Sequence, residues 1–521
     1  MQTFEEIFNT YQEKIDRQCQ ESQTRQIALT IDQQTTHNAS INTNVFEKIT
    51  NTSYDYERKI KLEQIAIDLK KEDQLFNKLE AKRLKPHLSD IFETPESIIE
   101  LKDIDFGKLF LTRNGFKCGD LVIVIDKHCK FVNCNITSLK FENYSNLVEE
   151  QKYDLIFDDL HNKDDNNLNI LIENSHFYGK FYINRKNLQE NTFNERDIKI
   201  KSFYIKNSTF HQNFKLHNAS VEEFDINDSN FEDKADFFKT QFIKGKNQKS
   251  LISFYAINFN ELAIFEECEF CEKVDFTYVT FKGLSQFRKA TFKKGLNLDN
   301  TNIEKDMNFF EIQSVDSSES KKQTSQETYR IIKHQLEKQN NKIEANRYYS
   351  CELEKRRKNL QDILKNIKLE KFKENISNNL ENLGSYLVFA LHNMTSAHAR
   401  NWFLVLLWIL TTGLFTTLAL NNEVGKSILG FLITIILMSG LFCRTYVPII
   451  LGLIASFGMF YIHQITFLNV ENIFQYTSLL AKLDSQKPDT SSFSLILFAN
   501  KIALGYLYYQ FITSVRKDTS K

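Results

Sequence analysis

Large apolar residues recur through the middle of this chain in steps that alternate between five and six residues. In the best-kept stretch, eight consecutive steps run 5, 6, 5, 6, 5, 6, 5 and 6. An α-helix repeats every 3.6 residues and a strand every two, so neither produces this spacing. The residues of this ladder are Phe265, Phe270, Phe276, Phe281, Phe287, Phe292, Leu298, Ile303 and Phe309.

A second series of smaller residues accompanies the ladder, each two positions before a large one. Because one polar residue separates the two, the large and the small side chain point inward together and the others point outward. Four steps, two of five and two of six residues, bring the chain back over itself. This predicts a square solenoid whose coils are each buried against their neighbours. The smaller residues include Ala263, Cys268, Val274, Val279, Ser285 and Ala290.

The repeated tripeptides resemble those of the pentapeptide-repeat family, in a Phe-rich variant: SNF, ADF, TQF, CEF, VDF, VTF, SQF and ATF. The resemblance covers roughly 129–311, and the weaker stretches at 143–170 and 243–252 are expected to be insertions. It implies a right-handed quadrilateral β-helix with the Phe side chains stacked inside. We therefore expect a solenoid domain over residues 100–315.

Two cysteines three positions apart, Cys268 and Cys271, look like half of a zinc site. On the ladder, however, Cys268 occupies an inward position and Cys271 the next outward one. Thiols on opposite sides of the chain cannot share a tetrahedral ion, so we expect no metal here. His211 and His217 would reach one ion only from adjacent corners of one face.

The chain contains no motif that signals catalysis. It has no glycine-rich phosphate loop, HExxH, G-x-S-x-G or pair of CxxC motifs. We therefore expect neither an enzyme nor a cofactor. Acidic solenoids of this family can imitate DNA, but the charges of this repeat region form no single-sign stripe, and nucleic acid is not an expected partner.

Helical patterns flank the repeats on both sides. Residues 1–95 alternate helix-like and polar stretches, and the Asn/Thr/Gln-rich segment 33–53 is predicted to be a linker. Residues 318–383 are predicted to be a basic helical connector. Within it, EANRYY (344–349) resembles the hairpin that follows the repeats in membrane-bound relatives. The basic run is expected either to contact anionic lipid headgroups or to be a solvated face: Lys355, Arg356, Arg357 and Lys358.

Residues 400–517 are predicted to be a transmembrane domain. Its four apolar stretches are long enough to span a bilayer. Basic residues near their ends favour cytoplasmic N- and C-termini, and the chain start does not resemble a secretory signal peptide. We therefore expect a multi-pass protein of a bacterial inner membrane. The expected helices are 402–420, 427–443, 447–465 and 492–515.

Lys501 lies nine residues inside the last of these spans, with Asn500 beside it and Gln510 further along. An ionisable residue at that depth either lines a watery path or bonds to polar groups of another span, and both interpretations stay open. The function that these patterns favour is a membrane-anchored scaffold whose solenoid binds an unknown protein partner. The alternative is an ion channel formed by a homo-oligomer of the spans and regulated by the solenoid.

Overall fold

The computed structural model divides into two compact units, Met1–Gln323 and Thr324–Lys521. The structure describes residues 2–43, 86–94, 96–113, 115–118, 121–148, 151–158, 160, 168–184, 198–245, 251–365, 376–419, 475–479 and 491–519, together with positions 71, 74 and 77.

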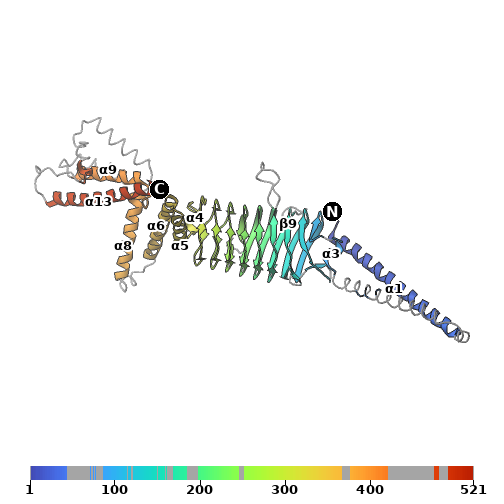
Figure 1. Cartoon of the computed structure of the whole chain (residues 1–521). Coiled ribbons are helices and arrows are strands. Elements are labelled where there is room, and N and C mark those ends of the chain that lie inside the picture. The colour runs from blue at the N-terminus through green and yellow to red at the C-terminus, as the bar shows by residue number, and fades with distance from the viewer. Residues whose placement is uncertain are drawn as a thin grey trace. The chain divides into compact units, whose positions relative to one another are not determined.

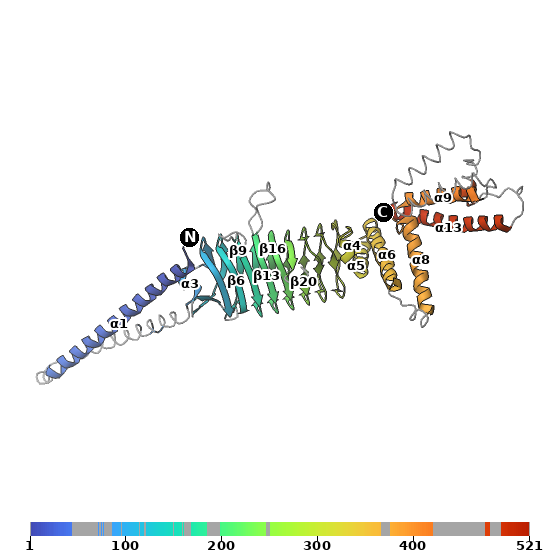
Figure 2. The same ribbon diagram turned by 180° about the vertical axis from the view of Figure 1, so that it is seen from behind.

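Parallel strands in three sheets build a solenoid in the first unit, and the views of Figures 1 and 2 show the strands following one another coil by coil. The strands of the nine-stranded sheet are β1 (Ile98–Lys102), β5 (His128–Val132), β9 (Leu155–Asp158), β12 (Phe181–Asn184), β15 (Phe214–Leu216), β18 (Ala235–Asp236), β22 (Ala263–Ile264), β26 (Ser285–Gln286) and β30 (Met307–Asn308). Those of the six-stranded sheet are β11 (His176–Phe177), β14 (Thr209–Phe210), β17 (Asn230–Phe231), β21 (Asn258–Phe259), β25 (Thr280–Phe281) and β29 (Asn302–Ile303).

The third sheet has thirteen strands. Its early strands are long and serve two faces of the coil: β16 pairs with β19 through its first half and with β20 through its second. Its strands are β2 (Asp105–Arg113), β3 (Gly115–Cys118), β4 (Leu121–Val124), β6 (Asn135–Tyr144), β10 (Leu168–Glu173), β13 (Ile198–Lys206), β16 (Ala219–Asn227), β19 (Gln241–Gly245), β20 (Ile252–Tyr255), β23 (Glu269–Phe270), β24 (Val274–Asp275), β27 (Thr291–Phe292) and β28 (Leu296–Asn297). Two departures from parallel pairing occur. At the start of this sheet β3 pairs antiparallel with β2 and β4, and β7 (Leu147–Val148) and β8 (Gln151–Lys152) form a short antiparallel pair of their own.

The strand register gives the length of each coil. Ala263 pairs with Ser285, and Ser285 pairs with Met307, so each of these coils is as long as four steps of the ladder. Coil length varies further upstream. Phe181 pairs with Phe214 and Ala235 pairs with Ala263 in longer coils, whereas Phe214 pairs with Ala235 in a coil slightly shorter than the regular ones. In the coil after Ala235, Gly245 ends β19 and β20 begins at Ile252, and residues 246–250 between them lie outside the described part of the chain.

Phenylalanine rings from successive coils form columns inside the solenoid. The rings of Phe237, Phe265, Phe287 and Phe309 are stacked, with centroids 5.0, 4.9 and 5.4 Å apart. All ladder residues are buried except Ile303, which is half-buried because β29 ends its sheet and no further coil covers it. The smaller residues Ala263, Cys268 and Ala290 are also buried, so the interior consists of apolar columns.

The five-residue steps contain a sharp turn that the six-residue steps lack. In each, the amide of the small residue donates to the carbonyl of the preceding large residue, as from Ala290 to Phe287 at 3.0 Å. The residue before the small one has a left-handed backbone, with φ of 59° at Tyr278 and 56° at Lys289. This is the geometry of a type II turn, in which that position favours glycine or asparagine.

We expect Lys289→Gly to stabilise the solenoid by about 0.5–1 kcal/mol. Left-handed backbone costs an L-residue about 1–2 kcal/mol, and the greater freedom of glycine in the unfolded chain cancels part of the gain. Thermal unfolding followed by far-UV circular dichroism measures the change. The matched control is Arg288→Gly in the same turn, where φ is ordinary and a loss of stability is expected. Equal effects of the two substitutions would contradict the turn assignment.

A helix covers the first coil. Phe4, at the start of α1 (Phe4–Thr43), stacks on Phe106 at 5.2 Å and meets Phe116 edge-on at 5.3 Å. Two short helices, α3 (Leu88–Ile91) and α4 (Ser320–Gln323), lie at the borders of the solenoid sequence. The prediction of a linker over residues 33–53 is wrong for residues 33–43, because α1 continues through them. Its polar residues are weak helix formers, but no Gly or Pro interrupts them, and the rest of the linker lies outside the described residues.

The second unit is helical. Its helices are α5 (Gln326–Lys338), α6 (Lys342–Lys365), α8 (Ile376–Ser396), α9 (Trp402–Ala419) and α13 (Ser491–Thr519). Trp408 and Val405 of α9 pack with Leu504 and Leu507 of α13. The predicted spans 402–420 and 492–515 correspond to α9 and α13, whereas 427–443 and 447–465 lie outside the described residues. In the described part of the chain, no helix combines the length and apolar character that crossing a membrane requires.

Candidate functional site

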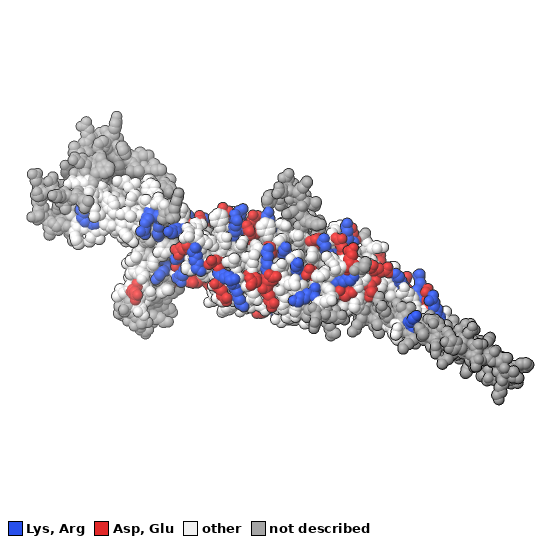
Figure 3. All heavy atoms as spheres, in the orientation of Figure 1, with Lys and Arg blue, Asp and Glu red and all other residues white. Residues whose placement is uncertain are grey.

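The outer surface of the solenoid carries ion pairs between successive coils. Glu267 lies between Lys239 at 3.6 Å and Lys289 at 3.7 Å, one coil to each side. Lys294 and Glu272 lie 2.5 Å apart. Figure 3 shows Lys and Arg interspersed with Asp and Glu over the visible face. Exposed pairs of this kind contribute about 0–1 kcal/mol each, so their main effect is to determine the charge pattern of the surface.

The cysteines and histidines of the repeats have separate partners. Cys268 is buried and its thiol donates to the carbonyl of Phe237 at 2.9 Å, whereas Cys271 lies half-buried beside Lys293. His211 contacts Glu232 at 2.8 Å and His176 at 3.4 Å, whereas His217 contacts Asp236 at 2.9 Å. Among the described residues, no three Cys, His, Asp or Glu side chains are grouped so that they could hold a metal ion.

The basic run of α6 is largely occupied by contacts within the second unit. Arg357 donates to both carboxylate oxygens of Glu354, at 2.9 and 3.1 Å, and Lys358 lies 3.7 Å from the same group. The guanidinium of Arg356 lies 5.2 Å from the centre of the Phe389 ring in α8. Lys355 is half-buried on the same helix. The run therefore joins α6 to α8, and its most exposed members are Arg356 and Lys358.

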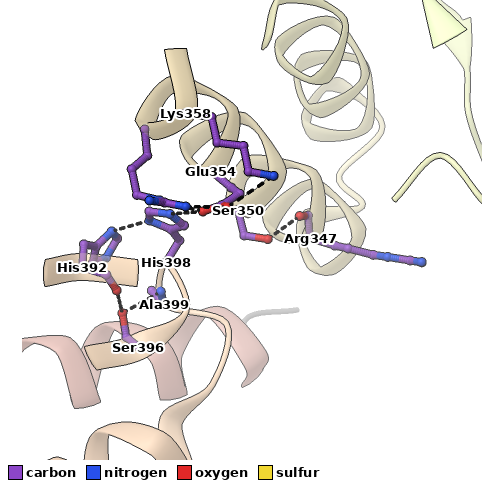
Figure 4. Close-up of polar contacts among 9 residues, drawn as sticks. Arg347, Ser350, Glu354, Lys358, His392, Ser396, His398 and Ala399 are labelled. Atoms are coloured by element: carbon purple, nitrogen blue, oxygen red, sulfur yellow. Dashed lines mark hydrogen bonds and ion pairs between the residues drawn. The ribbon is translucent and has the colours of Figure 1, made fainter. Parts of the chain in front are cut away.

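A chain of polar contacts connects α6 to the link between α8 and α9 (Figure 4). His398 lies in this link with Nε2 3.5 Å from the Glu354 carboxylate and Nδ1 3.2 Å from Nδ1 of His392. Burial opposes ionisation of Glu354, but the contacts with His398 and Arg357 outweigh it and hold its pKa far below the usual range. Glu354 is therefore a fixed negative charge between α6 and α8.

The link itself has an unusual backbone. Ala397, His398 and Ala399 all have left-handed φ angles, between 50° and 61°. The Ser396 hydroxyl accepts from the Ala399 amide at 2.9 Å and contacts the Gln510 side chain of α13 at 3.2 Å. Such conformations persist only where surrounding contacts enforce them, and the contacts to Glu354, His392 and Gln510 are suited to do so.

The polar residues of α13 do not gather into one site. Asn500 donates to the carbonyl of Tyr476 at 3.0 Å, and the Lys501 ammonium donates to that of Ser478 at 2.6 Å. Gln510 lies two to three turns further along and contacts Ser396. Lys501 and Asn500 thus hold the segment 475–479 against α13, which is the geometry of a structural role.

The EANRYY motif holds α6 in place. Ala345 and Tyr348 are buried, and Tyr348 stacks on Tyr329 of α5 at 6.4 Å. The ring of Tyr349 contacts two lysines, with the ammonium of Lys517 in α13 at 4.2 Å and that of Lys333 in α5 at 5.0 Å from its centre. The motif therefore packs α6 against both α5 and the end of α13.

Burial lowers the pKa of His392 to about 4, with further lowering by His398 and Lys517. An unfolded histidine titrates near 6.5, so the unfolded chain binds the proton first. Stability of the second unit is then complete above pH 6.5 and falls toward pH 4.5 by about 1–2 kcal/mol after allowance for partial exposure. We expect this fall in urea unfolding followed by tryptophan fluorescence, because both tryptophans of the chain lie in α9.

His392→Gln is expected to flatten this profile between pH 4.5 and 6.5, a window that lies above the titration of Glu354. The control is His176→Gln in the solenoid, which leaves the profile unchanged. A profile that stays steep in His392→Gln would exclude His392 as the titrating group.

Sequence reasoning missed the cluster of Glu354, His392 and His398. The only available signal was their polarity, since the segment between Glu354 and His398 carries no spacing that predicts a contact. His398 becomes buried only when α6 and α8 pack together, so its burial cannot be predicted from the sequence.

Comparison with protein families supports the identity of the repeats. Residues 254–306 match the family model described as pentapeptide repeats, in nine copies. Comparisons with curated proteins and with solved structures found no match. The matched segment coincides largely with the regular coils of four ladder steps, in which Phe rings follow one another in columns. This part of the chain is a pentapeptide-repeat solenoid.

Proposed function

We propose that the chain is a scaffold whose solenoid binds a protein partner on its outer faces. The observation that carries the proposal is the division of the solenoid into a filled apolar interior and a rigid polar exterior. Phe columns fill the interior, and outward side chains repeat at the spacing of the strands, ~4.8 Å. Such a body is suited to present side chains at fixed positions, which lowers the entropic cost of binding.

We further propose that the second unit attaches the scaffold to lipid, in a bacterial inner membrane with the solenoid in the cytoplasm. Support comes from large apolar side chains that are exposed on α8, α9 and α13, among them Val388, Phe403 and Phe498. Arg356 and Lys358 are exposed basic residues on the neighbouring helix α6, and such residues attract anionic headgroups.

Crosslinking of the full chain in its native cells, followed by affinity purification, tests the scaffold. A partner that crosslinks to residues of the solenoid supports it, and no crosslinked partner from repeated trials contradicts it. Membrane fractionation with a carbonate wash tests lipid attachment, which release into the wash would contradict. Conductance in liposomes that disappears in Lys501→Met would favour the channel instead.

A further inference from the structure

Two tyrosines stand exposed next to each other at one corner of the solenoid. Tyr255 and Tyr278 expose 43% and 56% of their surface, and their rings meet edge to face with centroids 5.6 Å apart. Among the described residues, neither hydroxyl has a hydrogen-bond partner. Most phenylalanine rings of the repeats fill the interior, whereas this pair presents apolar surface on the outside of a rigid coil.

The position of Tyr278 is one that other coils fill differently. It is the left-handed residue of its turn, with φ of 59°. Smaller residues occupy the corresponding positions of other coils. One is Ala256, and the others are short polar residues suited to this backbone: Asn174, Asn207, Asp228 and Asn300. A bulky ring at this position does not stabilise the turn, which indicates that the ring serves a contact outside the coil.

The carboxylates beside the pair lack basic partners. The backbone amide of exposed Asp228 donates to the carbonyl of Tyr255 at 3.0 Å, which brings the two residues side by side. Asp275 accepts from the amide of Thr277 at 3.0 Å and from Asn297 at 2.8 Å, both neutral donors. In the described part of the chain neither carboxylate forms an ion pair, in contrast to Glu267 at the other left-handed corner.

We propose that Tyr255, Tyr278, Asp228 and Asp275 form a docking surface, the tyrosine corner, for an arginine-bearing segment of the protein partner. The proposal rests on the proposed scaffold function and names the chemistry of its ligand. Guanidinium groups stack on tyrosine rings and donate paired hydrogen bonds to carboxylates. Tyrosine and arginine are also the residues most enriched at binding hot spots. The tyrosine corner offers both kinds of contact on adjacent coils.

Fluorescence anisotropy of a labelled (Gly-Arg)4 peptide with the full chain tests the proposal, with (Gly-Glu)4 as the charge control. We expect binding of the arginine peptide alone, weakened at least tenfold in the double variant Tyr255→Ser/Tyr278→Asn. Asparagine already occupies the same turn position at residues 174, 207 and 300, so this variant retains the coil, as circular dichroism verifies. Phe310→Ser is the matched control, because Phe310 is an exposed ring at the other corner, and it leaves the affinity unchanged.

Asp275→Asn is expected to weaken the binding of the arginine peptide and to reduce the salt dependence of that binding. Equal affinity in the double variant, or equal binding of (Gly-Glu)4, would overturn the proposal. Dimerisation that the double variant abolishes, without peptide binding, would assign the surface to a second copy and also overturn it. A crosslinked partner that binds the double variant as tightly as the unaltered chain would exclude the tyrosine corner while the scaffold function stands.

Discussion

Gly283→Ala is expected to destabilise the solenoid by more than ~3 kcal/mol and to lower its melting temperature by many degrees. A Cβ atom at this position would overlap the carbonyl group of Glu261 in the preceding coil and lie 2.6 Å from its Cα atom. These are backbone atoms that no side-chain rotation can move. The two coils must separate, and overpacking against rigid neighbours is among the most costly of substitutions.

Separation of the coils breaks contacts beyond the glycine itself. The amides of Thr280 and Lys282 donate to the preceding coil at 2.8 and 2.9 Å, and Phe281 stacks on Phe259 at 5.2 Å. Thermal unfolding by far-UV circular dichroism measures the loss. Lys282→Ala is the matched control, since Lys282 is the exposed neighbour of Gly283 and its truncation is expected to cost less than ~0.5 kcal/mol. Similar melting temperatures for the two variants would contradict the close approach of the coils.

Phe265→Ala is expected to cost about 3–5 kcal/mol, the range for truncating a fully buried aromatic side chain. Phe265 is fully buried and its ring is stacked between those of Phe237 and Phe287, at 5.0 and 4.9 Å. It also meets the edges of Phe254 and Phe276 from other faces of the coil. Because each coil is stabilised by its neighbours alone, a cavity in the middle weakens both interfaces at once.

Ile303→Ala provides the comparison within the same ladder. Ile303 is half-buried at the end of its column, so its truncation is expected to cost about 1 kcal/mol. Chemical denaturation of both variants, followed by circular dichroism, gives the two values. Equal losses at Phe265 and Ile303 would show that burial inside the columns does not determine stability.

The sequence predicted the coils where each face holds one short strand. Between Phe265 and Phe309 each corner fixes the step at five or six residues, so the spacing of the side chains reflects the path of the backbone. In β16 a single strand covers two faces, and its buried residues Val221, Phe224 and Ile226 follow at steps of three and two. The corner that sets the ladder is absent there, which explains why the early coils are harder to recognise.

The helical unit was predictable only in part. Apolar composition indicated the helices that became α9 and α13. The partners of its polar residues depend on which helices pack together, and a single sequence does not encode these contacts in a repeated spacing. Lys501 illustrates this, because its hydrogen bond to the Ser478 carbonyl joins two segments that share no pattern.

The left-handed turns give the solenoid an internal symmetry, and this symmetry allows strands to pair in a wrong register during folding. Glu267, Tyr278, Lys289, Asn300 and Glu311 follow one another at equal intervals, two to each of the regular coils, so each such coil consists of two halves with the same plan. A shift of the chain by one half-coil would still bring phenylalanine against phenylalanine and turn against turn. Backbone pairing alone therefore distinguishes the native register poorly from the shifted one.

The irregular coils remove this ambiguity. The coil from Ala235 to Ala263 is longer than the regular ones, and β19 and β20 lie further apart in its sequence than β23 and β24 do in the next coil. Its two halves therefore differ in length, so a chain shifted by one half-coil would no longer match this coil with strands of the same spacing. The longer coil, although it departs from the regular repeat, therefore helps to fix the strand register of the coils that follow it.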